Sequence, residues 1–262
     1  MLDVFEKVNR DIPFNGIPWF FDHCETITPK NIERVKALGG GIAIQDRMAF
    51  QGEYFVERYG AKAGEHTPPI KRMLAEGVPV GAGTDATRVS SYNPWTSLYW
   101  MVSGRTVGGL ALYPEGLSRD TALELYTRGS AWFSSEQGKK GQIKVGQLAD
   151  VVALSQDFFS VPEESIKWIE SVLTVVDGKV VYGTQEFDQL SPPSVPVLPD
   201  WSPVAKVPGH WRPGAPMAAA VHQCSGPCTV HAHSHDKARQ SKVPVSDFQG
   251  FWGAFGCSCF AF

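Results

Sequence analysis

The sequence predicts an α/β fold in which parallel strands alternate with helices, followed by a smaller β-rich part. Two observations predict it. Apolar strand-like runs and amphipathic helical runs alternate at about 30 residues per unit over the first third of the chain. Beyond residue 140, short β-rich runs joined by turn residues replace this pattern.

The first elements follow from periodicity and helix caps. A helix is predicted over residues 2–9 from its amphipathic spacing, and an apolar strand over 17–21. Thr28 then caps a second helix, which the glycines at 39–41 end. The run 42–45 is the next strand.

The central stretch of the chain is the strand predicted over residues 78–83. A longer loop at 46–65 precedes it, and then a helix whose predicted N-cap is Thr67. Small residues at 81–83 let other groups approach the strand backbone closely. The strand ends in a polar run that contains Asp85.

The rest of the chain divides by composition. Helices are predicted near 93–102 and 118–133, and β-rich runs at 141–154 and 171–182, the latter a hairpin with Asp177-Gly178 as its turn. We therefore expect three parts, listed here: an α/β part at 1–135, a small sheet at 136–186, and a Pro-rich strap with a Cys/His-rich tail at 187–262.

Composition excludes some functions. The net charge is −3 and charged residues make up 19% of the chain, so the composition does not indicate nucleic-acid binding. No apolar run is long enough to span a membrane. The sequence does not indicate a compartment.

His23 and Asp85 are the strongest candidate site residues. Each directly follows a predicted strand, and they lie two units apart, at the same end of alternate strands. They are therefore expected to face one site. The alternative is that Asp85 only makes local turn hydrogen bonds.

Two further polar residues are candidates for substrate contact. Gln45 ends the middle strand, although a strand-end amide can also serve loop hydrogen bonds. Arg88 can hold a carboxylate or carbonyl group of a substrate, or pair with a surface acid.

The C-terminal tail contains a second group of candidate metal ligands. Five of the seven His and four of the five Cys residues follow position 200. At this density they can bind zinc, copper or nickel, but a disulfide or a His-rich linker is an open alternative. The candidate tail ligands are Cys224, Cys228, His231, His233 and His235.

Taken together, the motifs at 20–25, 81–87 and 141–154 resemble the C-terminal part of a metal-dependent hydrolase of the amidohydrolase superfamily. The YtcJ-like proteins, of the amidohydrolase 3 type, are the nearest group, and the resemblance covers residues 2–183. It implies the C-terminal portion of a TIM-type (β/α) barrel with a partial β-sandwich domain.

The resemblance also implies a function. His23 would be a metal ligand, and Asp85 would bind metal and take the proton from the attacking water. The implied cofactor is a divalent metal, with zinc the first choice. The implied substrate is a small molecule with a carbon–nitrogen, amide-like bond.

The family's remaining ligands, a His-x-His pair on strand one, a Lys or Glu on strand four and a His on strand five, have no counterpart here. We therefore expect a truncated chain that is weak or inactive alone, completed by a missing N-terminal half or by a second copy in a homo-oligomer. The rival hypothesis is a non-catalytic remnant that binds metal or partners through its tail.

Overall fold

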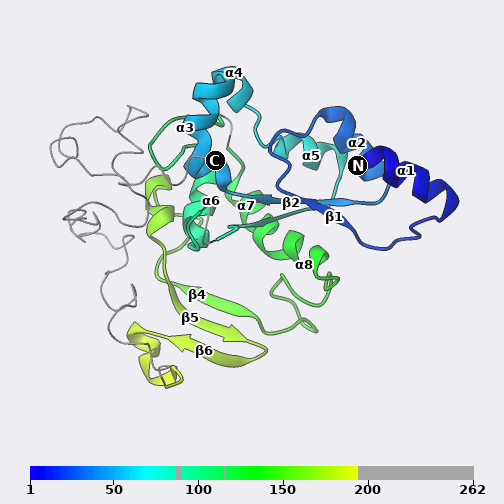
Figure 1. The fold of residues 1–262 in the computed structure, drawn as a ribbon. Coiled ribbons are helices and arrows are strands. Elements are labelled where there is room, and N and C mark those ends of the chain that lie inside the picture. Colours follow the sequence, from blue (N-terminus) through cyan, green and yellow to red (C-terminus); the bar gives the residue numbers. More distant parts are fainter. Residues whose placement is uncertain (87–89, 115, 194–262) are drawn as a thin grey trace, which may run out of the picture.

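The computed structural model describes residues 1–86, 90–114 and 116–193. Its first sheet has three parallel strands in the order β1-β2-β3 (Figure 1). The strands are β1 (Phe20–Asp22), β2 (Gly41–Gln45) and β3 (Val80–Gly83). The parallel order agrees with the alternating sequence pattern.

The first strand is shorter and begins later than the apolar run at 17–21 predicts. Pro18 has no N–H group and cannot donate to a ladder. The first bond to β2 accordingly runs from the Gly41 N–H to the Trp19 carbonyl oxygen, at 3.0 Å.

Helices α1 (Leu2–Asp11), α2 (Pro29–Ala37) and α5 (Ile70–Glu76) accompany this sheet. The predicted cap of α2 is confirmed, since the Thr28 hydroxyl accepts a hydrogen bond from the Asn31 N–H at 3.4 Å. The core is built from fully buried apolar residues of the middle strand and of α2 and α5, among them Ile42, Ile44, Ile32, Val35, Ile70 and Met73.

The predicted cap of α5 is wrong. Thr67 does not cap the helix, and its hydroxyl donates instead to the Ala63 carbonyl oxygen at 2.6 Å. The N-cap position is Pro69. A cap needs backbone N–H groups in the first turn, and prolines at 68 and 69 remove two of them.

The loop predicted over 46–65 is also wrong, because this stretch forms helices α3 (Arg47–Tyr59) and α4 (Ala61–Gly64). Gly52 lies inside α3, where glycine is unfavourable by propensity, and this hides the helix in the sequence. Tertiary packing explains the glycine. A Cβ there would lie 2.7 Å from the Thr106 side chain and 2.8 Å from that of Leu112.

The helices after β3 agree with the sequence pattern. They are α6 (Pro94–Ser103), α7 (Arg119–Glu124), the π-helical turn η1 (Leu125–Gly129) and α8 (Ser130–Phe133). The last two contact β3 closely. The Ser130 hydroxyl donates to the Ala82 carbonyl oxygen at 2.9 Å, and the absent side chain of Gly81 leaves room for the Phe133 ring.

A second, antiparallel sheet follows in the order β4-β5-β6. Its strands are β4 (Val151–Leu154), β5 (Ser171–Val176) and β6 (Lys179–Gly183), with the 3-10 turns η2 (Glu163–Trp168) and η3 (Gln185–Leu190). The predicted hairpin turn is confirmed, with φ of 50° at Asp177 and 73° at Gly178.

The β-rich prediction for 141–154 is only partly right. Residues 141–150 are not strand, because Gly141 and Gly146 turn the chain at positive φ. Ile143 and Val145 between them are almost completely exposed. Only the apolar run 151–154 pairs into the sheet.

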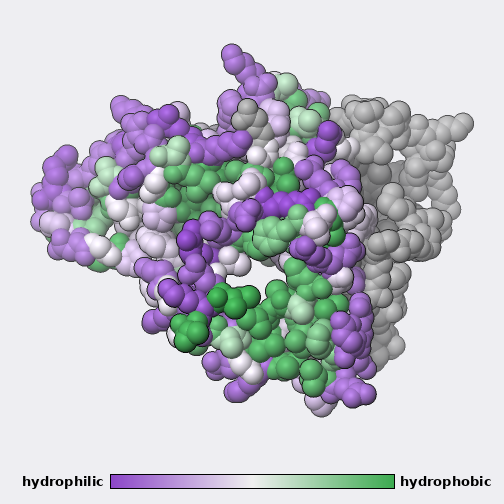
Figure 2. All heavy atoms as spheres, turned by 180° about the vertical axis from the view of Figure 1, so that it is seen from behind, coloured by the Kyte–Doolittle hydropathy of each residue, from purple (hydrophilic) through white to green (hydrophobic). Residues whose placement is uncertain are grey.

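Both sheets are open. In the described ranges no further strand pairs with β1 or β3, so the parallel strands do not close into a barrel. Figure 2 shows apolar residues gathered over the part of the molecule that the second sheet forms, where Val152, Val176 and Val181 are about half exposed.

No helix of the described ranges is long and apolar enough to cross a membrane.

The close approach of α8 to β3 can be tested by adding one methyl group. A Cβ at Gly81 would lie 2.7 Å from the Phe133 ring and 3.0 Å from the Ser130 Cα. We expect Gly81→Ala to lower the free energy of unfolding by about 1–3 kcal/mol through overpacking. Gly83→Ala is the control, since nothing lies within 4 Å of its Cβ position. Urea unfolding of both variants measures this, and equal stabilities would contradict it.

Candidate active site at the carboxyl ends of the parallel strands

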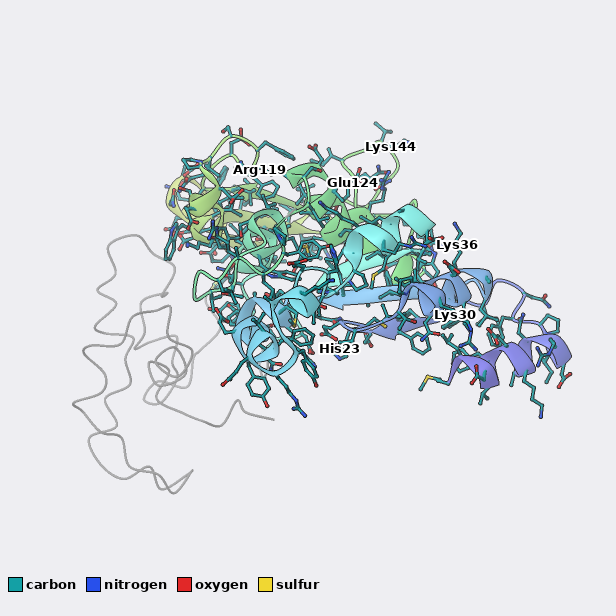
Figure 3. The ribbon with its side chains drawn as sticks, turned by 90° about the horizontal axis from the view of Figure 1, so that it is seen from above. His23, Lys30, Lys36, Arg119, Glu124 and Lys144 are labelled. Atoms are coloured by element: carbon teal, nitrogen blue, oxygen red, sulfur yellow. The ribbon has the colours of Figure 1, made fainter. Side chains whose placement is uncertain are left out.

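His23 follows β1 directly and lies at the end of the sheet from which α3 starts (Figure 3). Its N–H donates to the Ala43 carbonyl oxygen at 2.8 Å, so the strand ladder runs up to this residue. The chain then turns sharply, with φ of 73° at His23 and 61° at Cys24. Such left-handed conformations cost non-glycine residues about 1 kcal/mol or more, and they cluster at functional sites.

Asp85 follows β3 and also has positive φ, 52°. Its Oδ2 lies 3.8 Å from the His23 Nδ1, so the structure brings these two residues together across the end of β2. Both side chains are partly exposed, but the His23 Nδ1 atom itself is buried and has no hydrogen-bond partner in the described part of the chain.

Arg47 and Glu25 complete the charged cluster, and neither was predicted as a site residue from the sequence. The Arg47 Nη2 donates to the Asp85 Oδ2 at 3.2 Å, and its Nε lies 3.8 Å from the Glu25 Oε1. Arg47 is the first residue of α3, directly after Asp46 and two positions beyond the end of β2. The strand-end rule that found His23 and Asp85 could have found it, but an expected loop concealed the helix.

Asp46 is a buried acid behind this cluster, and it too was missed. Its side chain is fully buried, and neither carboxylate oxygen completes a hydrogen bond of normal geometry with a described residue. Burial raises the pKa of Asp46 to about 7, with a smaller raise from the Asp85 charge, while the nearby hydroxyls of Ser90 and Ser97 oppose the raise. Burial, together with the charge of Asp46, also raises the pKa of Tyr126.

Gln45 ends β2 opposite Gly83 of β3, in the row of strand ends that also carries His23. It is almost fully buried, and its Oε1 has no hydrogen-bond partner in the described ranges. Its contact with substrate stays a prediction. Arg88 and the tail candidates, Cys224, Cys228, His231, His233 and His235, lie outside the described residues.

The side chains at the strand ends supply only part of a metal site. The described ranges contain no group of three or more His, Cys, Asp or Glu side chains that could hold one. His23 and Asp85 fit two positions, because a gap of 3.8 Å is compatible with two ligand bonds of about 2.0–2.2 Å each. Arg47 holds the same carboxylate oxygen, so its charge would compete with a cation there.

Two known proteins are similar in sequence to this chain. The N-substituted formamide deformylase of Arthrobacter pascens is 26% identical over 186 residues, which are 70% of this chain and 34% of that protein. The amidohydrolase YtcJ of Bacillus subtilis (strain 168) is 26% identical over 187 residues, 68% of this chain and 35% of that protein.

Among solved structures, an uncharacterized metal-dependent hydrolase from Pyrococcus horikoshii OT3 superposes with a TM-score of 0.51 and 25% identity. The match covers 62% of this chain and 32% of that one. The chain thus spans about a third of the length of each of these relatives.

The model of the amidohydrolase family matches residues 1–182, well over half of the chain. The chain therefore belongs to the amidohydrolase family. The resemblance inferred from the three motifs is confirmed, and so is its link to YtcJ.

The buried Asp46 predicts a pH dependence of stability. Its pKa in the folded chain, about 7, lies above the ordinary value of 3.8. Well below pH 3.8 both states carry the proton, and as the pH rises the unfolded state loses it first. As the pH rises through 7, the folded state must bury a charge, so stability falls between about pH 4 and pH 7 and is constant above. The difference between the two pKa values corresponds to a loss of about 4 kcal/mol.

Urea unfolding of the unchanged chain and of Asp46→Asn from pH 4 to 8 measures this loss. We expect the Asp46→Asn variant to lack the loss, and Asp11→Asn, at an exposed site, to retain it. Parallel curves for all three proteins would contradict a raised pKa at Asp46.

Proposed function

We propose that the chain carries one part of the active site of a metal-dependent hydrolase that cleaves carbon–nitrogen bonds of small amide-like molecules. The observation that carries the proposal is the approach of His23 and Asp85 at the carboxyl ends of β1 and β3. In parallel α/β enzymes this edge is where catalytic groups gather. Membership of the amidohydrolase family, and likeness to a metal-dependent hydrolase, support it.

His23 and Asp85 would be the residues that hold the metal, with zinc the first choice. Bound there, the metal supplies a water of lowered pKa and polarises the carbonyl group. Asp85 accepts the proton of the attacking water and passes it to the leaving nitrogen. Oxygen of water bonds to the carbonyl carbon, the carbon–nitrogen bond breaks, and a carboxylic acid and an amine result.

Arg47 orients Asp85 for this work, since its guanidinium holds the Oδ2 atom at 3.2 Å. Gln45 and Arg88 are the proposed substrate contacts. The buried, unpartnered Oε1 of Gln45 can accept a hydrogen bond from a substrate N–H group. N-substituted formamides, named for one relative, belong to the proposed substrate class.

We further propose that this chain alone has little or no activity. A catalytic zinc needs about three protein ligands, and the described ranges supply two. The division into an α/β part to residue 135, a small sheet to 186 and a tail remains our proposal for its organisation. The remaining ligands would come from the N-terminal half of a family member or from a second copy.

Metal binding gives a first test. We expect zinc affinity, measured by competition with a chromophoric chelator, to fall at least about tenfold in His23→Ala and in Asp85→Asn, because each removes a ligand. His66→Ala, at an exposed histidine, is the control and should be unchanged. Zinc lost only on deletion of residues 223–235 would favour the rival function, a metal-binding remnant that uses its tail.

Turnover gives a second test. The chain is assayed with zinc or manganese against amides and cyclic ureides, with and without the co-expressed N-terminal half of a full-length relative. We expect turnover only with that half, reduced at least about 100-fold by Asp85→Asn because the general base is lost. Turnover by the chain alone, abolished by Asp85→Asn, would overturn the proposed dependence. Failure in both arms would favour the remnant.

A further inference from the structure

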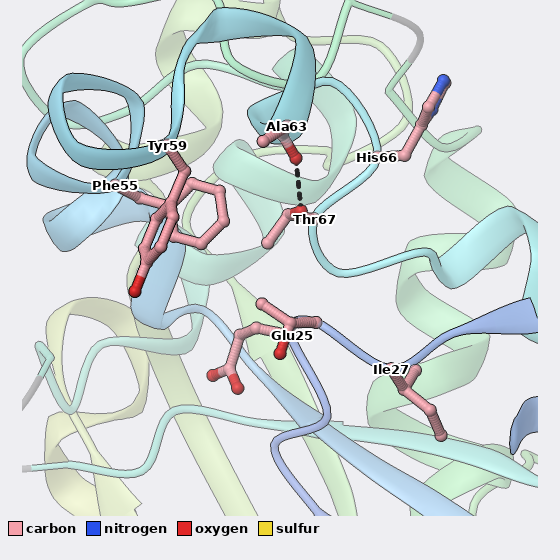
Figure 4. Close-up of a pocket in the computed structure, with 8 residues that line it drawn as sticks. Glu25, Ile27, Phe55, Tyr59, Ala63, His66 and Thr67 are labelled. Carbon is pink, nitrogen blue, oxygen red and sulfur yellow. Dashed lines mark hydrogen bonds between the residues drawn. The ribbon is translucent and has the colours of Figure 1, made fainter.

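A pocket of about 460 Å³ opens beside the charged cluster, between the segment after β1 and helices α3 and α4 (Figure 4). The segment after β1 supplies one side, α3 supplies two aromatic rings, and α4 with the turn after it closes the pocket. The lining residues are Glu25, Thr26, Ile27, Phe55, Tyr59, Ala63, His66 and Thr67.

The walls are suited to a flat apolar group. The rings of Phe55 and Tyr59 lie 4.8 Å apart between centroids and are tilted by 45°. Ile27 adds an aliphatic surface. The volume is ample for one aromatic ring with a short side chain.

The pocket carries one formal negative charge. Among its lining residues Glu25 is the acid, and none is Lys or Arg. The Glu25 Oε1 is buried and has no hydrogen-bond partner in the described ranges, since the Arg47 Nε is 3.8 Å away. A buried acceptor without a partner is costly, and a donor or cation supplied by a ligand would relieve it.

The position of Glu25 connects the pocket to the proposed reaction. Glu25 follows His23 by two residues and faces Arg47, which in turn holds Asp85. Glu25, in the wall of the pocket, is therefore linked to Asp85 through a single guanidinium group. Hydrolysis of an amide yields a carboxylate and an amine, and a pocket lined by a carboxylate repels the first and attracts the second.

We propose that this pocket binds the substituent on the amide nitrogen, and that the substrates are amides whose nitrogen bears an aryl or arylalkyl group. This rests on the proposed function and makes its substrate class more specific. Glu25 accepts a hydrogen bond from the nitrogen side of the substrate, and Phe55 and Tyr59 contact the ring. On cleavage the electron pair of the carbon–nitrogen bond stays on nitrogen, which takes the proton from Asp85 and leaves as the amine.

The test measures binding to the metal-free 262-residue chain and needs no turnover. The probe is 2-phenylethylammonium, which combines a ring with a cation. Its matched partners are 3-phenylpropanoate, with the opposite charge, and n-butylammonium, without a ring. By ligand-observed NMR titration we expect the first to bind at least about tenfold tighter than either partner, because only it meets both the rings and the carboxylate.

Substitutions assign the two contacts. We expect Glu25→Gln to weaken 2-phenylethylammonium about tenfold by removing the charge, and Phe55→Leu or Tyr59→Leu about fivefold by removing a ring. Glu57→Gln, an exposed acid on the same helix and outside the pocket, is the control and should change affinity less than about twofold. Circular dichroism and thermal midpoints verify that each variant is folded, and having two ring variants keeps the test decisive if one unfolds.

Equal binding of the two charged phenyl probes, or no effect of Glu25→Gln, would overturn the proposal. Failure of the pocket is distinguishable from failure of the proposed function. Selective binding without turnover in the complemented enzyme leaves the pocket standing and removes the hydrolase. Turnover of simple amides without selective binding of the probe would support the hydrolase and overturn the pocket proposal.

Discussion

The parallel pairing of β2 with both of its neighbours is the constraint on which the rest of the structure depends. It aligns the ends of β1 and β3, so that residues two units of the repeating pattern apart meet at one edge. Buried Ile42 and Ile44 hold the middle strand in the core. Because the carboxyl ends of parallel strands all lie at the same edge of the sheet, His23 and Asp85 lie close to one another.

Charge around this edge is closely paired. Arg47 stands between two carboxylates, those of Asp85 and Glu25, and the imidazole of His23 completes the group. Three of its buried atoms, the His23 Nδ1, the Glu25 Oε1 and the Arg47 Nε, have no hydrogen-bond partner among the described residues. Unsatisfied buried polar atoms are rare in folded proteins and cluster where a ligand completes them. The unsatisfied atoms therefore support the proposed binding site at this edge.

The sequence predicted the helices that begin at a capping residue. Thr28, Asn93 and Ser118 each accept a hydrogen bond from the first turn of the helix they precede. The prediction failed where tertiary packing overrides propensity. Glycine is required at position 52 because the side chains of Thr106 and Leu112 occupy the space of a Cβ there, and no local pattern predicts these neighbours.

The sequence by itself determined the parallel α/β order, the family, and the pair His23 and Asp85, because strand ends and cap residues are local features with a regular spacing. Only the tertiary structure decided the rest. Arg47 enters the site because β2 runs straight into α3, and Asp46 becomes buried because later helices pack over it. The pocket exists because Glu25 and Phe55, which are 30 residues apart in the chain, both contribute to its walls. Contacts between distant segments depend on how whole elements pack, and local periodicity carries no record of them.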